Sequence, residues 1–143
     1  MARGWCAGFL GFLTTTSGLI DRSGADLWIT ASRVRYIEQG VPFSERKLYT
    51  VLSTPGVAVA AKYIARFSQW QRPDGGQESV QVVGFDLDQS LGGPWNVVEG
   101  NPADLKAADN IFIDEIYKDK LGVTHLGQIK EIRGHRARIA GFT

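Results

Sequence analysis

The predicted fold is organised around residues 111–143, IFIDEIYKDKLGVTHLGQIKEIRGHRARIAGFT. Residues 111–113 form a short apolar run, which predicts a buried strand. Asp114 can cap the turn that follows, because its carboxylate accepts from free backbone N–H groups. Gly122 supplies the left-handed backbone that ends a short helix about two turns later. The stretch therefore begins as a strand followed by a short helix.

The second half of this stretch predicts a β-hairpin. Residues 129–132 and 137–139 flank Arg133 and Gly134. Glycine tolerates the positive φ of a two-residue loop, whereas arginine is a poor first loop residue because asparagine or aspartate adopts positive φ more easily. Strand, short helix and hairpin together predict a docking scaffold, and nothing in this stretch has the pattern of a catalytic motif.

Composition indicates one folded domain of ordinary size. The chain has 143 residues, of which 43% are hydrophobic and 22% are charged, as in a globular domain. The net charge of +1 provides no overall field that would attract nucleic acid or anionic lipid. Cys6 is the only cysteine, which excludes an internal disulfide and a metal site built from cysteines.

The front of the chain is apolar. Residues 5–20 (WCAGFLGFLTTTSGLI) carry no charge and follow Arg3. This run is shorter than the roughly twenty residues that cross a bilayer as a helix. Three interpretations remain open: the core of a signal peptide, an amphipathic core helix, or the outer end of a transmembrane helix whose beginning is missing. A signal peptide would need a small-residue cleavage site, for which residues 14–16 (TTT) are a weak substitute.

The middle of the chain predicts a strand, a helix and a long hairpin. Residues 26–30 alternate between apolar and polar and predict a first strand. Residues 44–53 predict a helix with Ser44 as its N-cap. Residues 57–70 repeat apolar side chains at period two, and residues 78–85 are the returning strand. The Pro-Asp-Gly turn between them should stand in solvent.

A second short helix should begin at Asn101, which caps it, with Pro102 at the first helical position and Asp104 in the first turn. The predicted fold class is α+β. It comprises a mixed or antiparallel sheet with long hairpins and short packed helices, preceded by the apolar N-terminal helix.

Two sets of residues were weighed as chemical sites. His125 and His135 would need further ligands to bind zinc, and the nearest carboxylates in sequence are Asp114, Glu115 and Asp119. We favour solvated loop histidines.

Asp86 and Asp88 are two residues apart in the sequence and could serve acid–base chemistry or bind a cation. We favour a pair that ends a strand and satisfies turn backbone.

A local basic cluster lies near the C-terminus. Arg136 and Arg138 alternate with Ala137 and Ile139. This alternation favours a solvated strand face over a phosphate-binding site. The other members of the cluster are Arg133 and His135.

Several segments in sequence order resemble one family, the periplasmic core domain of FtsX/MacB-like permeases of ABC transporters, nearest to the DevC-type exporters. The resemblance covers about residues 10–143. Lys130 departs from the family pattern at a position usually held by an apolar strand residue, and Arg133 replaces the usual Asn or Gly. The matching segments are GADLWI (residues 24–29), TPGV (54–57), VVGFD (82–86), VEGN (98–101), IDE to LG (113–122), and Gly127, Ile132, Gly134, Ile139 and Gly141.

The resemblance implies a non-catalytic domain fragment with no cofactor. Residues 1–20 would be the end of a first transmembrane helix, and residues 21–143 the first part of the periplasmic core domain, truncated at its C-terminus. The domain would couple motion driven by a separate ABC ATPase to a periplasmic adaptor or to the exported substrate. The implied location is the inner membrane, with the domain facing the periplasm. The implied partners are the ATPase, the rest of the permease, the adaptor and the membrane, without nucleic acid.

The hairpin tip, residues 71–77, is the predicted partner contact because its turn chemistry should hold it in solvent. The alternatives are a small standalone α+β enzyme that uses Asp86 and Asp88, or a ligand-binding module. The predicted contact residues are Trp70, Gln71, Arg72, Asp74 and Gln77.

Overall fold

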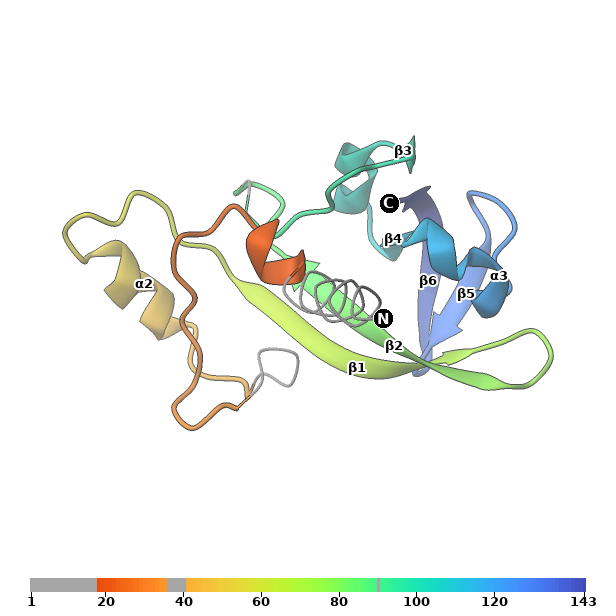
Figure 1. Cartoon of the computed structure of the whole chain (residues 1–143), viewed down its shortest axis with the longest axis horizontal. Helices are drawn as coiled ribbons and strands as arrows, with labels where there is room; N and C mark the ends of the chain where they lie inside the picture. Colours follow the sequence, from red (N-terminus) through yellow and green to blue (C-terminus); the bar gives the residue numbers. More distant parts are fainter. Residues whose placement is uncertain (1–17, 36–40, 90) are drawn as a thin grey trace, which may run out of the picture.

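The protein is described by a computed structural model over residues 18–35, 41–89 and 91–143. In these residues a six-stranded sheet carries a few short helices, so the predicted α+β class is confirmed (Figure 1). In chain order the elements are α2 (Arg46–Leu52), β1 (Tyr63–Gln71), β2 (Gln77–Phe85), β3 (Glu99–Gly100), η2 (Pro102–Lys106), β4 (Asn110–Ile113), η3 (Glu115–Tyr117), α3 (Lys118–Leu121), β5 (Ile129–Ile132) and β6 (His135–Phe142).

The sheet is mixed and mostly antiparallel. Its strands run in the order β2-β1-β5-β6-β3, with β4 beside β6. β4 and β6 are parallel, and the other pairs are antiparallel. β6 organises this arrangement, because β5 pairs with its first half, β4 with its second half, and β3 with its last two residues.

The predicted C-terminal hairpin is confirmed. β5 and β6 pair from Ile129↔Arg138 to Ile132↔His135. The two loop residues both have positive φ, 52° at Arg133 and 81° at Gly134, as in the type I′ turn that matches strand twist. Arg133 therefore occupies the backbone conformation that suits it poorly.

The β1–β2 hairpin is a long arm. Its two strands pair over nine residues, from Tyr63↔Phe85 to Gln71↔Gln77, so the ladder is about 30 Å long at roughly 3.3 Å per residue. β1 joins β5 at the single registered pair Trp70↔Ile132. The far end of the arm thus enters the C-terminal part of the sheet, while its near end lies beside the N-terminal part of the described chain (Figure 1).

The hydrophobic core lies at the far end of the arm. Trp70 is 1% exposed, and its indole Nε1 donates to the carbonyl oxygen of Leu121 at 2.9 Å. Burying an indole of this size contributes about 5 kcal/mol at roughly 25 cal/mol per Å². The buried core consists of Trp70, Ile113, Leu121, Val123, Ile139 and Phe142.

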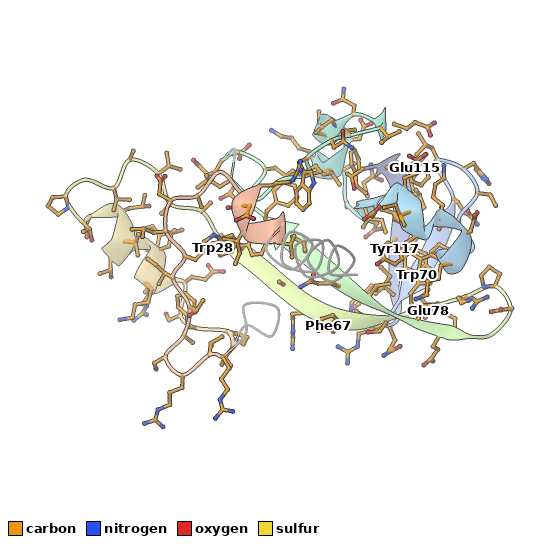
Figure 2. The ribbon with its side chains drawn as sticks, viewed as in Figure 1. Trp28, Phe67, Trp70, Glu78, Glu115 and Tyr117 are labelled. Atoms are coloured by element: carbon orange, nitrogen blue, oxygen red, sulfur yellow. The ribbon has the colours of Figure 1, made fainter. Side chains whose placement is uncertain are left out.

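The arm buries opposite faces at its two ends. Tyr63 and Ala65 share one face of β1, and Ala65 is 6% exposed. Ser68 and Trp70 are buried on the other face, since side chains alternate along a strand. At the near end the ring of Trp28 meets that of Tyr63 edge-on, with centroids 4.8 Å apart. Figure 2 shows Trp28 and Trp70 at opposite ends of the arm.

Two strand predictions need correction. Residues 26–30 form no strand, and Leu27 and Ile29 are 84% and 55% exposed. Their alternation finds no strand to pair with among the described residues. The strand predicted over residues 57–70 begins only at Tyr63, because its partner β2 ends opposite that residue, at Phe85.

The predicted helices are present, with shorter bounds. α2 lies within the predicted residues 44–53, but its N-cap is Glu45 and not the predicted Ser44, whose Oγ accepts from the N–H of Arg46 at 3.4 Å. The helix predicted from Asn101 is the 3₁₀ helix η2, whose first turn is capped by the Asn101 side chain. Asp114 caps η3 as predicted, and Gly122 ends α3 with φ 63°.

The predicted apolar N-terminal helix falls mostly on residues 1–17, which lie outside the described part of the chain. Residues 18–21 are helical. In the ranges that the structure describes, no helix is long and apolar enough to cross a membrane.

Candidate functional site

The tip of the arm is a tight, self-bonded turn. The Arg72 N–H donates to the Gly76 carbonyl at 2.8 Å, and the Gly75 N–H donates to the Arg72 carbonyl at 3.1 Å. Asp74 Oδ1 accepts from the Gly76 N–H at 3.0 Å, and Gly75 has φ 85°. Proline, aspartate and glycine thus take the roles that the sequence predicts.

Charged side chains tie this tip to α3. Arg72 contacts Asp74 at 2.7 Å and Glu78 at 3.4 Å. The second carboxylate oxygen of Glu78 forms an ion pair with Lys120 Nζ, 3.0 Å away. Exposed pairs of this kind contribute about 0–1 kcal/mol each, so their main effect is to orient the tip. The tip is therefore connected to α3, in the C-terminal part of the chain.

The predicted partner contacts divide into two groups. Trp70 was predicted to contact a partner, and this is wrong for its side chain, because the indole is 1% exposed and bonded within the core. Gln71, Asp74 and Gln77 are exposed, and Arg72 is partly buried. The Gln77 amide donates to Gln71 Oε1 at 3.3 Å, so these side chains form one small polar surface.

Asp86 and Asp88 serve the turn after β2. Asp86 Oδ1 accepts from the N–H of Asp88 at 3.2 Å. Asp88 is exposed and its carboxylate contacts Lys106 Nζ at 3.1 Å. This geometry matches the favoured turn role. The acid–base alternative would require the carboxylates to converge on a substrate, and here they bond to the turn and to a lysine.

The histidines lie apart from the carboxylates weighed with them. His125 is exposed, and its Nδ1 lies 2.8 Å from the Thr124 hydroxyl. His135 is exposed at the start of β6. Asp114 caps the N–H of Ile116. Within the described ranges, no three side chains among His, Cys, Asp and Glu come together in a geometry that could hold a metal ion.

The basic cluster forms a solvated strand face, as the alternation predicts. Ala137 and Ile139 are buried, whereas Arg136 and Arg138 are exposed. Arg136 donates from Nε and Nη2 to Asp109 Oδ2, at 3.1 and 2.8 Å. One of the three arginines of the cluster is therefore neutralised locally.

Sequence reasoning missed a depression at the near end of the arm. It has a volume of about 530 Å³, and the guanidinium of Arg22 lies 6.0 Å from the ring centre of Trp95. Gly92 and Gly93 pack closely against Tyr63 and Phe85. A Cβ at Gly92 would lie 2.7 Å from the Tyr63 ring. The Gly-Gly-Pro loop at residues 92–94 was the sequence feature that could have indicated this depression. The depression is lined by Arg22, Ser23, Phe85, Leu87, Trp95 and Lys106, among others.

Buried polar atoms also mark the near end. The Trp28 indole nitrogen and the Tyr63 hydroxyl are buried and have no hydrogen-bond partner among the described residues. Burial raises the pKa of the Tyr63 hydroxyl above its ordinary value, because the phenolate would lose hydration. Among the described residues, the buried indole and hydroxyl at this end of the arm therefore lack hydrogen bonds, whereas the Trp70 indole at the core end has one.

Comparison with models of known protein families finds no match, and comparison with curated proteins finds none either.

Proposed function

We propose that the chain is a non-catalytic fragment of the periplasmic core domain of an ABC-transporter permease of the FtsX/MacB-like type. In this proposal the domain is attached to the inner membrane. The domain faces the periplasm and couples motion driven by an ABC ATPase to a periplasmic adaptor or to the exported substrate. The family-like segments quoted above, in their order along the chain, are the first support for it.

The observation that carries the proposal is the continuity of the β1–β2 arm. Its near end contacts the N-terminal segment through Trp28 and Tyr63, and its far end enters the core through Trp70. Nine paired residues lie between these contacts without a register shift. A continuous ladder resists bending in the plane of its hydrogen bonds, so displacement at one end would be transmitted to the other.

The polar surface at the tip is the proposed partner contact, now without the Trp70 side chain. Gln71, Asp74 and Gln77 are exposed on a turn held by its own hydrogen bonds. A contact formed by preordered side chains costs less conformational entropy on binding than one formed by a loose loop. The ion pairs of Glu78 with Arg72 and Lys120 would pass force from this contact into α3.

The enzyme alternative has weaker support. Asp86 and Asp88 bond to the adjoining turn and to Lys106, an arrangement that commonly ends a strand. The ligand-binding alternative would use the depression beside Trp95, where an arginine lies over an aromatic ring.

Site-specific photo-crosslinking in cells tests the proposal. A photoreactive residue at Gln77 should crosslink to a periplasmic adaptor protein, and the same residue at Tyr49 on α2, which is 71% exposed, should not. The double variant Gln71→Ala/Gln77→Ala, and a variant with residues 73–75 replaced by a Gly-Ser loop, should each lower recovery of the purified adaptor in a pull-down. Unchanged recovery with both variants would contradict the proposed contact.

A further inference from the structure

β2 lies at the edge of the sheet. It pairs with β1 on one side, and no other described strand pairs with it. An edge strand exposes a row of backbone N–H and C=O groups that can pair with another strand. The opposite edge differs, because β3 has only two residues.

The hydrogen bonds of the hairpin identify which groups face outward. The bond from the Arg72 N–H to the Gly76 carbonyl sets the phase of the antiparallel ladder, in which bonded and non-bonded pairs alternate. Glu78, Val80, Val82 and Gly84 then bond to β1. The backbone groups that point away from β1 belong to Gln77, Ser79, Gln81, Val83 and Phe85.

Over residues 79–85 this edge lacks the charges, the prolines and the bulges that natural proteins use to prevent pairing. Residues 79–85 (SVQVVGF) contain no charged residue and no proline. The pairing of β2 with β1 has no bulge that would twist the edge away. The one charge on the strand, Glu78, is held by Arg72 and Lys120 of its own chain.

We propose that β2 pairs antiparallel with β2 of a second copy of this chain, joining two sheets across a two-fold axis. A charged peptide finds no complementary charge along residues 79–85, whereas the strand's own neutral sequence meets no repulsion. With the axis at Gln81, each outward-facing residue opposes another: Ser79 meets Val83, and Gln77 meets Phe85. Val80 then lies opposite Val82, a β-branched pair of the kind that stabilises adjacent strands. Glu78 lies opposite Gly84, so no like charges meet.

The exposed side chains beside the edge support this arrangement. Val82 is 39% exposed and Ile64 is 60% exposed. Both lie on the same face of the hairpin, because Val82 opposes Arg66 and Ile64 opposes Gly84. A second copy would continue this apolar strip across the joined sheet. The inference is independent of the proposed permease function.

Proline at position 79 tests the edge directly. The Ser79 N–H points away from β1, so Ser79→Pro leaves the β1–β2 ladder intact and blocks the outer edge. Ser79→Ala keeps the N–H and is the matched control. In sedimentation velocity over about two decades of concentration, the wild-type chain and Ser79→Ala should form dimers. Ser79→Pro should raise the dimer dissociation constant about a hundredfold, since two symmetric hydrogen bonds are lost.

Amide hydrogen exchange of the wild-type chain gives a second test that needs no variant. The N–H groups of Val80 and Val82 should be protected at every concentration. Those of Ser79, Gln81 and Val83 should exchange fast in dilute solution and become protected as the concentration rises. A chain that stays monomeric overturns the proposal. So does equal association of the proline and alanine variants, or exchange at Ser79, Gln81 and Val83 that does not depend on concentration.

Discussion

The indole Nε1 of Trp70 donates a buried hydrogen bond to the carbonyl oxygen of Leu121, 2.9 Å away. This bond joins the arm to the short helix α3, although the two residues lie 51 positions apart. It satisfies a carbonyl at the C-terminus of α3, where the helix leaves its last carbonyls without intrahelical partners. The residue that fills the core thus also fixes the end of the arm.

Replacement of Trp70 by phenylalanine should destabilise the protein by about 2–4 kcal/mol. The smaller ring leaves a cavity, and the buried Leu121 carbonyl loses its partner, which costs about 1–3 kcal/mol by itself. Urea denaturation measures the loss. Trp95→Phe is the control, since Trp95 is 37% exposed and its replacement should cost less than about 1 kcal/mol. Equal losses in the two variants would contradict the assigned core.

Gly100→Ala should cost about 1–3 kcal/mol more than Gly56→Ala. The two glycines have similar φ, 98° and 90°, so alanine suffers comparable backbone strain at both. A Cβ at Gly100 would collide with the backbone of Ala140 and Gly141 on β6, whereas one at Gly56 meets nothing within 4 Å. Thermal denaturation of both variants separates the steric clash with β6, which only Gly100→Ala has, from the backbone strain that both variants share. Similar melting temperatures would argue against the β3–β6 contact.

Arg133→Asn should stabilise the protein by about 0.5–1 kcal/mol, because asparagine tolerates positive φ better than arginine does. Arg133 has φ 52° in the type I′ loop and is exposed, so its side chain contributes little to packing. Arg133→Ala is the control, since it removes the charge without improving the loop conformation. Urea denaturation compares both variants with wild type; equal stabilisation by Arg133→Asn and Arg133→Ala would assign the effect to loss of the charge instead of to the loop conformation.

Tyr63→Phe should reduce the loss of stability at high pH. Burial raises the pKa of Tyr63 in the folded chain, so the folded state keeps a proton that the unfolded state releases. This ionisation leaves the unfolding free energy unchanged below about pH 10, the ordinary tyrosine pKa, and lowers it as the pH rises further, because the unfolded state then releases the proton first. The unfolding free energy should therefore fall less steeply above about pH 10 in Tyr63→Phe than in wild type.

Tyr63→Phe should be neutral or slightly stabilising at pH 7, because the buried Tyr63 hydroxyl has no partner in the part of the chain that the structure describes. Tyr49→Phe, at a side chain that is 71% exposed, controls for the general effect of removing a phenol. A marked loss of stability at pH 7 in Tyr63→Phe would show that this hydroxyl makes a favourable interaction.

Local signals in the sequence predicted the elements well where the backbone itself demanded particular residues. The Pro-Asp-Gly turn predicted the arm, and Asn101 with Pro102 predicted η2. Gly122 marked the end of α3, and Gly134 marked the second hairpin. In each case the side chain or its absence sets a local torsion or hydrogen bond, which needs no knowledge of the rest of the fold.

Long-range pairing decided the cases in which sequence reasoning failed. Residues 26–30 have the alternation of a strand, but among the described residues no neighbouring strand pairs with them. The parallel pairing of β4 with β6 leaves no periodic signature. Trp70 was placed among the partner contacts because it adjoins an exposed turn, yet strand alternation turns its side chain into the core.

Substituted-cysteine labelling tests whether the arm faces the periplasm of a membrane-bound permease. Cys6 is the only cysteine, so Cys6→Ser gives a cysteine-free chain as the blank, and Gln77→Cys in that background places one thiol at the exposed tip. If the arm faces the periplasm of a membrane-bound permease, a membrane-impermeant maleimide should label this thiol in intact spheroplasts as fully as after lysis. Labelling that appears only after lysis would contradict the account.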